Sequence, residues 1–132
     1  MNLKKSWIWI IFILFSIAEI YYTWIYQDRI PASIETITIV LGCAFFLFLG
    51  YTLYCSEKEN LFKSIGKIAK LHWGRQIGVD LYIGLFFQSY LIYLNEESVL
   101  ETIIWVIPLL VYGNIATLLY WLLNAGSILT KF

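Results

Sequence analysis

Long apolar runs alternate with short segments that hold most of the charged residues. The charged segments are Met1–Lys5, Asp28–Glu35, Glu57–Arg75, Asn95–Glu101 and Lys131. The apolar runs are Trp7–Tyr26, Ile34–Cys55, Ile77–Leu94 and Leu100–Leu123. A helix that crosses a bilayer needs about 20 mostly apolar residues. The pattern therefore predicts an all-α fold, an integral membrane four-helix bundle that forms one domain over residues 1–132.

The connections between the runs predict how the helices are joined. Short turns at Pro31 and at Asn95–Val99 predict two antiparallel hairpins. The longer connection Ser56–Gln76 has apolar residues at helical spacing, which predicts an amphipathic helix on the inner leaflet. Its other face is basic and holds Lys63, Lys67 and Lys70. Two interpretations of this segment are open. Its basic face recognises anionic lipid or a partner, or the segment is only a connector between two spans.

The basic residues predict the orientation of the bundle. Lys and Arg keep a loop in the cytoplasm, and of the nine in this chain only Arg29 falls in a predicted outer turn. Both termini, including Lys131, are therefore expected on the cytoplasmic side. Lys4 and Lys5 before an apolar run also suit a cleaved signal peptide, but the run is too long and has no small-x-small cleavage site, so a retained helix is expected.

Composition agrees with a lipid environment. The chain is 61% hydrophobic and 14% charged, against roughly 45–50% and about 25% in soluble domains. The expected location is therefore the cell membrane (cytoplasmic or inner membrane), with several passes. The formal net charge is zero, so a nucleic-acid partner is not expected.

The sequence gives little support for an enzyme. There is no phosphate-binding glycine loop, no nucleophile elbow and no cluster of Cys and His with metal-ligand spacing, so no cofactor or metal is expected. Cys43 and Cys55 are three helical turns apart, which is too far for a disulfide. An enzymatic activity is therefore not favoured.

Polar side chains inside the apolar runs are costly in lipid and mark candidate sites. Glu19 falls in the outer half of the first run, where a carboxylate is protonated, hydrogen-bonded or beside water. Gln88 and Asn114 are expected at a similar depth on the third and fourth helices. These positions predict a small polar site between helices one, three and four, with Tyr22 and Thr117 as neighbours.

Other polar and small residues have two open interpretations. Asp80 recurs on one helical face with Gly84 and Gln88. It suits either a functional role or a cap at the inner interface. Gly113 and Thr117 suit either the predicted site or plain helix packing through small residues and interhelical hydrogen bonds.

The C-terminal half, from about Gly78 to Ser127, carries a moderately specific motif. Its segments are Val79-Asp80-Leu81-Tyr82-Ile83, Glu97-Ser98, Trp105, and Tyr112-Gly113-Asn114-Ile115-Ala116-Thr117 with Tyr120. On these residues the chain resembles a family of small membrane proteins of plants and bacteria with a domain of unknown function. That family has a serine or similar small residue where Asn114 stands. The resemblance implies a membrane fold and no particular activity.

Ala18-Glu19-Ile20 gives a second likeness, to small multidrug resistance exporters. These are four-helix proteins with a membrane-embedded glutamate on the first helix. Tyr21, Tyr22 and Thr23 replace the Gly-Thr and lysine that follow the glutamate in those exporters. Their third-helix motif of glycine and tryptophan has no counterpart either, so the departures are larger than the match.

Three functions follow as hypotheses. The first is binding of a small hydrophobic or lipid-like ligand at the polar site around Glu19. The second is an accessory or assembly subunit that docks another membrane protein. The third is a small proton-coupled transporter in which Glu19 titrates, working as a homodimer because four helices enclose little space.

Overall fold

The computed structural model describes residues 3–26 and 36–131, all within or between helices. The elements are α1 (Leu3–Tyr21), a π-helical turn η1 (Tyr22–Tyr26), α2 (Thr36–Lys58), α3 (Leu61–Ile68), α4 (His72–Glu96), α5 (Val99–Tyr112) and α6 (Asn114–Lys131). In this part of the chain, three helices are long and apolar enough to cross a membrane, namely α1 with η1, α2 and α4. The first three expected spans are thus confirmed as helices, whereas the turn at Pro31 lies outside the described residues.

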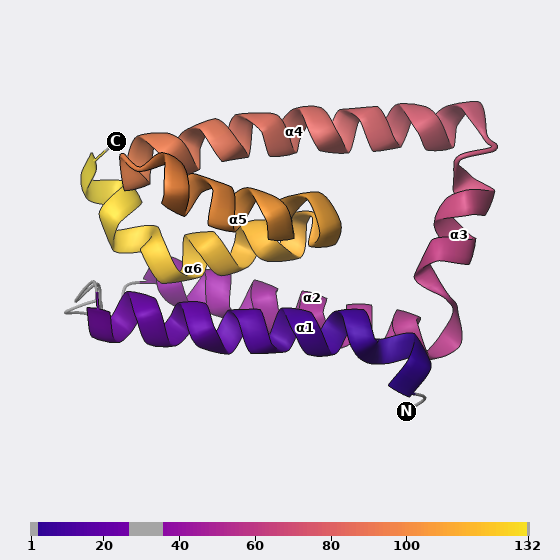
Figure 1. Cartoon of the computed structure of the whole chain (residues 1–132), viewed down its shortest axis with the longest axis horizontal. Helices are drawn as coiled ribbons and strands as arrows, with labels where there is room; N and C mark the ends of the chain where they lie inside the picture. Colours follow the sequence, from indigo (N-terminus) through magenta and orange to yellow (C-terminus); the bar gives the residue numbers. More distant parts are fainter. Residues whose placement is uncertain (1–2, 27–35, 132) are drawn as a thin grey trace.

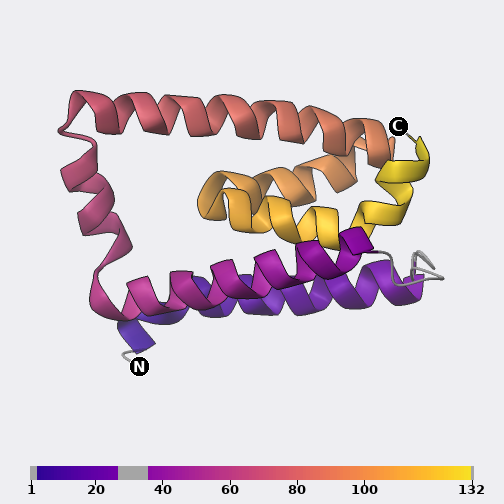
Figure 2. The ribbon, with the colours of Figure 1, turned by 180° about the vertical axis from the view of Figure 1, so that it is seen from behind.

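The long helices α1, α2 and α4 run along the length of the molecule, and α5 and α6 lie between them (Figure 1). The short helix α3 crosses one end and joins α2 to α4, as both views show (Figures 1 and 2). The N-terminus lies near this end, which we call the α3 end. The C-terminus lies at the opposite end, which we call the C-terminal end.

The expectation of one continuous fourth span over Leu100–Leu123 is wrong. The chain turns back at Gly113, which has φ 63° and ψ −135° and separates α5 from α6. This backbone conformation is open to glycine and strained for any residue with a Cβ. Pro108 already interrupts the backbone hydrogen bonding of α5 one turn earlier. The result is an α5–α6 hairpin in place of a single helix.

The expectation that both termini share one end is also wrong, because α6 runs back along α5. Lys131 Nζ lies 2.7 Å from Glu97 Oε1 and donates to the carbonyl oxygen of Asn95 at 3.0 Å. Both partners belong to the turn between α4 and α5. The ammonium group holds the pKa of the Glu97 carboxyl below its ordinary value by hydrogen bonding and charge. These contacts fix the end of α6 at the C-terminal end.

The α5–α6 hairpin forms most of the buried core. The buried apolar residues of the hairpin are Trp105, Leu109, Ile115, Ala116, Leu119, Tyr120, Leu123, Ala125 and Ile128. By contrast, only 6% of the apolar stretch of α2 and 11% of that of α4 is buried. Large apolar side chains such as Phe46 and Leu47 on α2 and Phe86 on α4 point outward. The three long helices therefore wrap the hairpin and expose an apolar surface.

The amphipathic helix expected in the connection Ser56–Gln76 is present as α3, but it is shorter than expected: α2 extends to Lys58, α4 already begins at His72, and Lys70 follows the end of α3. Asn60 begins α3 by accepting a hydrogen bond from the backbone N–H of Lys63 at 3.2 Å. Lys63, Lys67 and Lys70 are exposed, as the pattern predicts. The corner from α3 into α4 is tight, because a Cβ on Gly74 would lie 2.1 Å from the carbonyl oxygen of Ile68. Only glycine fits at this corner.

Candidate functional site

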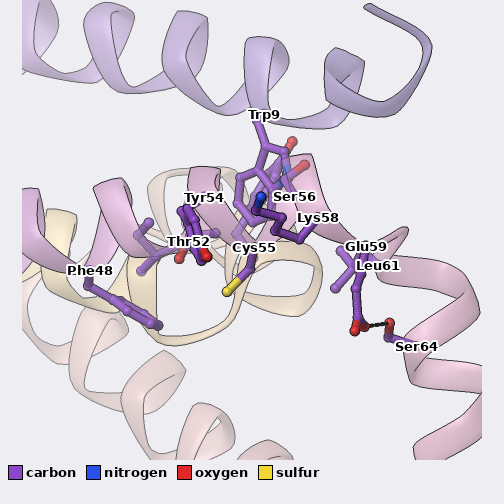
Figure 3. Close-up of a pocket in the computed structure, with 12 residues that line it drawn as sticks. Trp9, Phe48, Thr52, Tyr54, Cys55, Ser56, Lys58, Glu59, Leu61 and Ser64 are labelled. Carbon is purple, nitrogen blue, oxygen red and sulfur yellow. Dashed lines mark hydrogen bonds between the residues drawn. The ribbon is translucent and has the colours of Figure 1, made fainter. Parts of the chain in front are cut away.

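A cavity of about 460 Å³ lies at the α3 end of the molecule. We call it the α3 cavity. Its lining comes from α1, the last turns of α2, the start of α3 and the tip of the hairpin, and comprises Trp9, Phe48, Thr52, Tyr54, Cys55, Ser56, Lys58, Glu59, Leu61, Ser64, Tyr112 and Ile115. In Figure 3, Trp9 projects from α1 toward the side chains of α2. A volume of this size lies in the range of small-molecule sites, roughly 300–1,000 Å³.

The cavity exists because α5 ends before it reaches α3. The tip of the hairpin is held by Tyr112, whose hydroxyl donates to the carbonyl oxygen of Ile8 at 2.6 Å. The Tyr112 ring also packs against Trp9 and Phe12, with ring centroids 5.6 Å and 4.6 Å apart. These contacts hold the tip of the hairpin at the level of the first turns of α1. The space between this tip and α3 is left unfilled.

The α3 cavity is polar at one end and apolar at the other. Phe48 and Ile115 lie toward the centre of the molecule, whereas Lys58 and Glu59 lie at the junction of α2 with α3. The Glu59 carboxylate accepts a hydrogen bond from the Ser64 hydroxyl at 2.7 Å (Figure 3). Such a gradient suits an amphiphile, a molecule with an apolar chain and a polar head.

A second polar site lies at the C-terminal end, around three carboxylates that we call the acidic cluster: Glu19, Glu96 and Glu101. They come from α1, α4 and α5. The hydroxyl of Tyr22 donates to Glu101 at 3.1 Å, and that of Tyr120 donates to Glu96 at 2.9 Å. Tyr22 opens the π-helical turn η1, a rare conformation that is frequent at functional sites.

Buried amides support the acidic cluster. Asn95 donates from Nδ2 to the Tyr120 hydroxyl at 2.7 Å and accepts from the Ser127 hydroxyl at 2.9 Å. Asn124, which also borders the cluster, donates to the carbonyl oxygen of Tyr120 at 3.0 Å. The Trp105 ring packs edge-on against Tyr120 at 5.0 Å. Tyr120 is therefore held from several sides with its hydroxyl on Glu96.

Glu19 lies close to two like charges. The carboxylates of Glu101 and Glu96 both act on it electrostatically. Among the described residues nothing donates a hydrogen bond to Glu19, and the gap that it borders has no room for a water-sized sphere. The gap beside the acidic cluster is thus too narrow to hold an organic ligand.

Replacing Glu19 by glutamine is expected to stabilise the protein. The amide removes one like charge and supplies a donor to the neighbouring carboxylates, and one such hydrogen bond contributes about 1 kcal/mol. Thermal unfolding in detergent should show a midpoint higher by a few degrees. Glu97→Gln, which removes the partner of Lys131, should not raise the midpoint. A lower midpoint for Glu19→Gln would contradict the described arrangement.

The structure brings together Glu19 and Tyr22 and separates them from the other predicted site residues. Gln88 on α4 accepts a hydrogen bond from Trp121 Nε1 at 3.2 Å. Within the described chain, Gln88 Nε2 and Thr117 Oγ1 are buried with no hydrogen-bond partner. Thr117 lies one turn before Trp121 on α6. Gln88 and Thr117 therefore belong to the packing of α4 on α6.

Asn114 and Asp80 do not approach Glu19. Asn114 is exposed at the tip of the hairpin, whereas Glu101 at the other end of α5 lies beside Glu19. Tyr112 follows Glu101 by eleven positions on α5, which corresponds to a rise of about 17 Å. Asp80 is exposed on α4. The expected meeting of Glu19, Gln88 and Asn114 at one depth does not occur, because the hairpin reverses the direction of α6.

Sequence reasoning missed the α3 cavity and two members of the acidic cluster. Glu96 and Glu101 fall in a charged segment that the sequence assigns to an outer turn, with no sign that they face Glu19. For the cavity a signal was present. Pro108 and Gly113-Asn114 are helix-breaking residues in the middle of an apolar run, and a break there leaves space at the α3 end.

Comparisons with known proteins add no family. No family model matches the chain, and neither the curated proteins nor the solved structures give a match. Within the described residues, no group of His, Cys, Asp and Glu side chains is placed to hold a metal ion. The interpretation of the site therefore depends on its own geometry.

Proposed function

We propose that this chain is a multi-pass membrane protein that binds a hydrophobic or lipid-like ligand in the α3 cavity. The observation that carries the proposal is the cavity of about 460 Å³ with one apolar and one polar end. Three long apolar helices with outward-facing apolar side chains support the membrane location. A ligand of this kind reaches the cavity from the surrounding lipid.

The α3 end faces the cytoplasm in this proposal. Lys58, Lys63, Lys67, Lys70 and Arg75 lie at or beside α3, whereas Lys131 is at the C-terminal end. Basic residues on short loops remain in the cytoplasm. The polar end of the cavity then lies at the level of the inner head groups, and its apolar end extends toward the acyl chains.

The α5–α6 hairpin is then a re-entrant element that enters and leaves on the outer side. An irregular backbone at membrane depth is tolerated where it is buried in protein or lines a cavity. Tyr112 and Ile115, on either side of the turn at Gly113, line the α3 cavity, so the turn lies beside this cavity. The two acidic residues of the α4–α5 turn, Glu96 and Glu97, fall at the outer surface.

The two cysteines of the chain give a matched test of the cavity. Both are free and exposed, but only Cys55 lines the cavity, whereas Cys43 lies three turns away on α2. Single-cysteine proteins are made by Cys43→Ala or Cys55→Ala and labelled with pyrenyl maleimide to completion. Native mass spectrometry after extraction in a mild detergent then reports any retained lipid-sized adduct.

The adduct is expected on the unlabelled proteins and on the protein labelled at Cys43. It should be lost when Cys55 carries the label, because the pyrene fills the cavity. Retention of the adduct after labelling at Cys55, to the same extent as after labelling at Cys43, would exclude the cavity as the binding site.

A further inference from the structure

The short helix α3 has two faces of opposite character. Its apolar face holds Phe62, Ile65 and Ile68, which recur every three residues and are 60%, 51% and 50% exposed. The other face is basic and exposed, and its residues, which we call the α3 lysines, are Lys63, Lys67 and, just after the helix, Lys70. A helix of this kind is stable where one face meets an apolar layer and the other meets water or opposite charge.

The rest of the described chain does not supply that apolar layer. Within residues 3–26 and 36–131, the extensive contacts between helices join the long helices and the hairpin, and none of them involves α3. A free helix of eight residues is marginal in water, because nucleation is costly. Leu71 and Trp73 at the corner into α4 are 63% and 77% exposed and enlarge the apolar surface. The helix α3 therefore needs a surface outside the chain.

The position of α3 fits the surface layer of a bilayer. Figures 1 and 2 show α3 running across one end of the molecule, from the end of α2 to the start of α4. Because α2 and α4 cross the membrane in the proposed function, α3 lies along its surface. Leu61, on the apolar side of α3, lines the α3 cavity, so this side is turned toward the long helices. The apolar face then enters the acyl-chain layer, and the α3 lysines remain among the head groups.

Charge decides which lipid this surface fits. Residues 57–75 contain five Lys and Arg against two Glu, which leaves a net charge of three positive. Both glutamates precede α3, and the carboxylate of Glu59 accepts a hydrogen bond from the Ser64 hydroxyl. Within the part of the chain that the structure describes, no ion pair involves the α3 lysines. Clusters of this kind are attracted to anionic lipids, whereas zwitterionic head groups carry no net charge to attract them.

We propose that α3 is a docking surface for anionic phospholipid of the cytoplasmic leaflet. Its apolar face enters the acyl-chain layer, and the α3 lysines pair with head-group phosphates. Lipid docked in this way also holds in place the wall that Leu61 and Ser64 give to the α3 cavity. The proposal shares the membrane location with the proposed function and does not depend on a ligand in the cavity.

The charge of this surface is tested by competition between two lipids. Purified full-length protein in a mild detergent receives equal amounts of phosphatidylglycerol and phosphatidylcholine with the same acyl chains, and native mass spectrometry reports the ratio that is bound. The triple variant Lys63→Gln/Lys67→Gln/Lys70→Gln removes the charge. Its matched control is Lys63→Arg/Lys67→Arg/Lys70→Arg, which keeps the charge at the same positions.

The wild type and the arginine variant are expected to prefer phosphatidylglycerol, and the glutamine variant should lose about tenfold or more of this preference. The magnitude follows from a contribution of about fivefold for each basic residue beside an anionic surface. An unchanged preference in the glutamine variant, or an equal loss in the arginine variant, would overturn the proposal. Labelling of Cys55 tests the cavity separately, so either proposal can fail without the other.

The placement of the apolar face is tested in nanodiscs that contain phosphatidylglycerol. In a background with Cys43→Ala and Cys55→Ala, the fluorophore NBD is attached through Ile65→Cys on the apolar face or Lys67→Cys on the basic face. Dithionite reduces NBD only where water reaches it, so the label at position 67 should be reduced several-fold faster than the label at position 65. Equal rates would overturn the docking on lipid and would leave the apolar face to a protein partner.

Discussion

Gly113→Ala is expected to destabilise the protein by about 2 kcal/mol, because a Cβ is strained at φ 63° and ψ −135°. The hairpin supplies most of the buried core, so its loss is a loss of the whole fold and not of a peripheral turn. Thermal unfolding in detergent, followed by circular dichroism, should show a midpoint several degrees lower. Alanine at position 113 also favours helical backbone angles, and so favours a continuous helix from α5 into α6 over the hairpin.

Gly126→Ala is the matched control for this variant. Gly126 lies inside α6 on the same hairpin, and a Cβ there meets no atom within 4 Å. Alanine is the better helix former, by roughly 0.5–1 kcal/mol, so Gly126→Ala should be neutral or slightly stabilising. Equal midpoints for the two variants would show that the chain does not turn back at Gly113.

Gly74→Ala is expected to displace α3 from the start of α4. The added Cβ would lie 2.1 Å from the carbonyl oxygen and 2.6 Å from Cγ2 of Ile68. A backbone oxygen cannot rotate away as a side chain can, so the corner itself must open at a cost of about 1–3 kcal/mol or more. Because α3 forms one wall of the cavity, the variant should also lose the lipid-sized adduct.

Trypsin reports this displacement directly, since Lys67 and Lys70 precede the corner. Cleavage after these lysines should be several-fold faster in Gly74→Ala than in the wild type. Gly78→Ala is the control, because Gly78 lies one turn further along α4 and a Cβ there meets no atom within 4 Å. Cleavage of both variants at the wild-type rate would contradict the described corner.

The sequence predicts the long helices and α3 well, for a physical reason. Residues 7–26, 36–58 and 72–96 are apolar over the length of a bilayer crossing, and their charged flanks mark where each ends. The α3 segment is recognised by its helical periodicity, with Leu61 and Ile65 on one side and Lys63 and Lys67 on the other. These are local signals that depend on few tertiary contacts.

The hairpin could not be predicted from hydropathy, because Leu100–Leu123 has the length of a single span. A run of this kind crosses once if it stays helical and turns back if it breaks, and mean apolarity is the same in both cases. The break at Gly113 is fixed by tertiary contacts, among them the bond from Tyr112 to Ile8 and the pairing of Lys131 with Glu97. Basic residues alone would place Lys131 at the same end as α3, whereas it pairs with Glu97 at the C-terminal end.

The sequence predicts only part of the surroundings of Glu19. Glu19 does lie among polar groups with Tyr22, as its position in an apolar run suggests. Its neighbours are Glu96 and Glu101, whereas Asn114 begins α6 at the far tip of the hairpin. A depth calculated for a continuous fourth helix therefore does not apply to Asn114. The cavity at the α3 end follows from the same reversal, which is why it was not anticipated.

The α5–α6 hairpin underlies both the cavity and the proposed function, and the side of the membrane on which α6 ends tests it directly. In a background with Cys43→Ala and Cys55→Ala, single cysteines are placed by Lys131→Cys at the end of α6 and by Lys67→Cys on α3. A membrane-impermeant maleimide is applied to intact cells and to permeabilised cells. The account predicts that Lys131→Cys is labelled from outside and Lys67→Cys only after permeabilisation. Labelling of both only after permeabilisation would mean that α5 and α6 cross as one span, and would contradict the hairpin and the cavity that it leaves open.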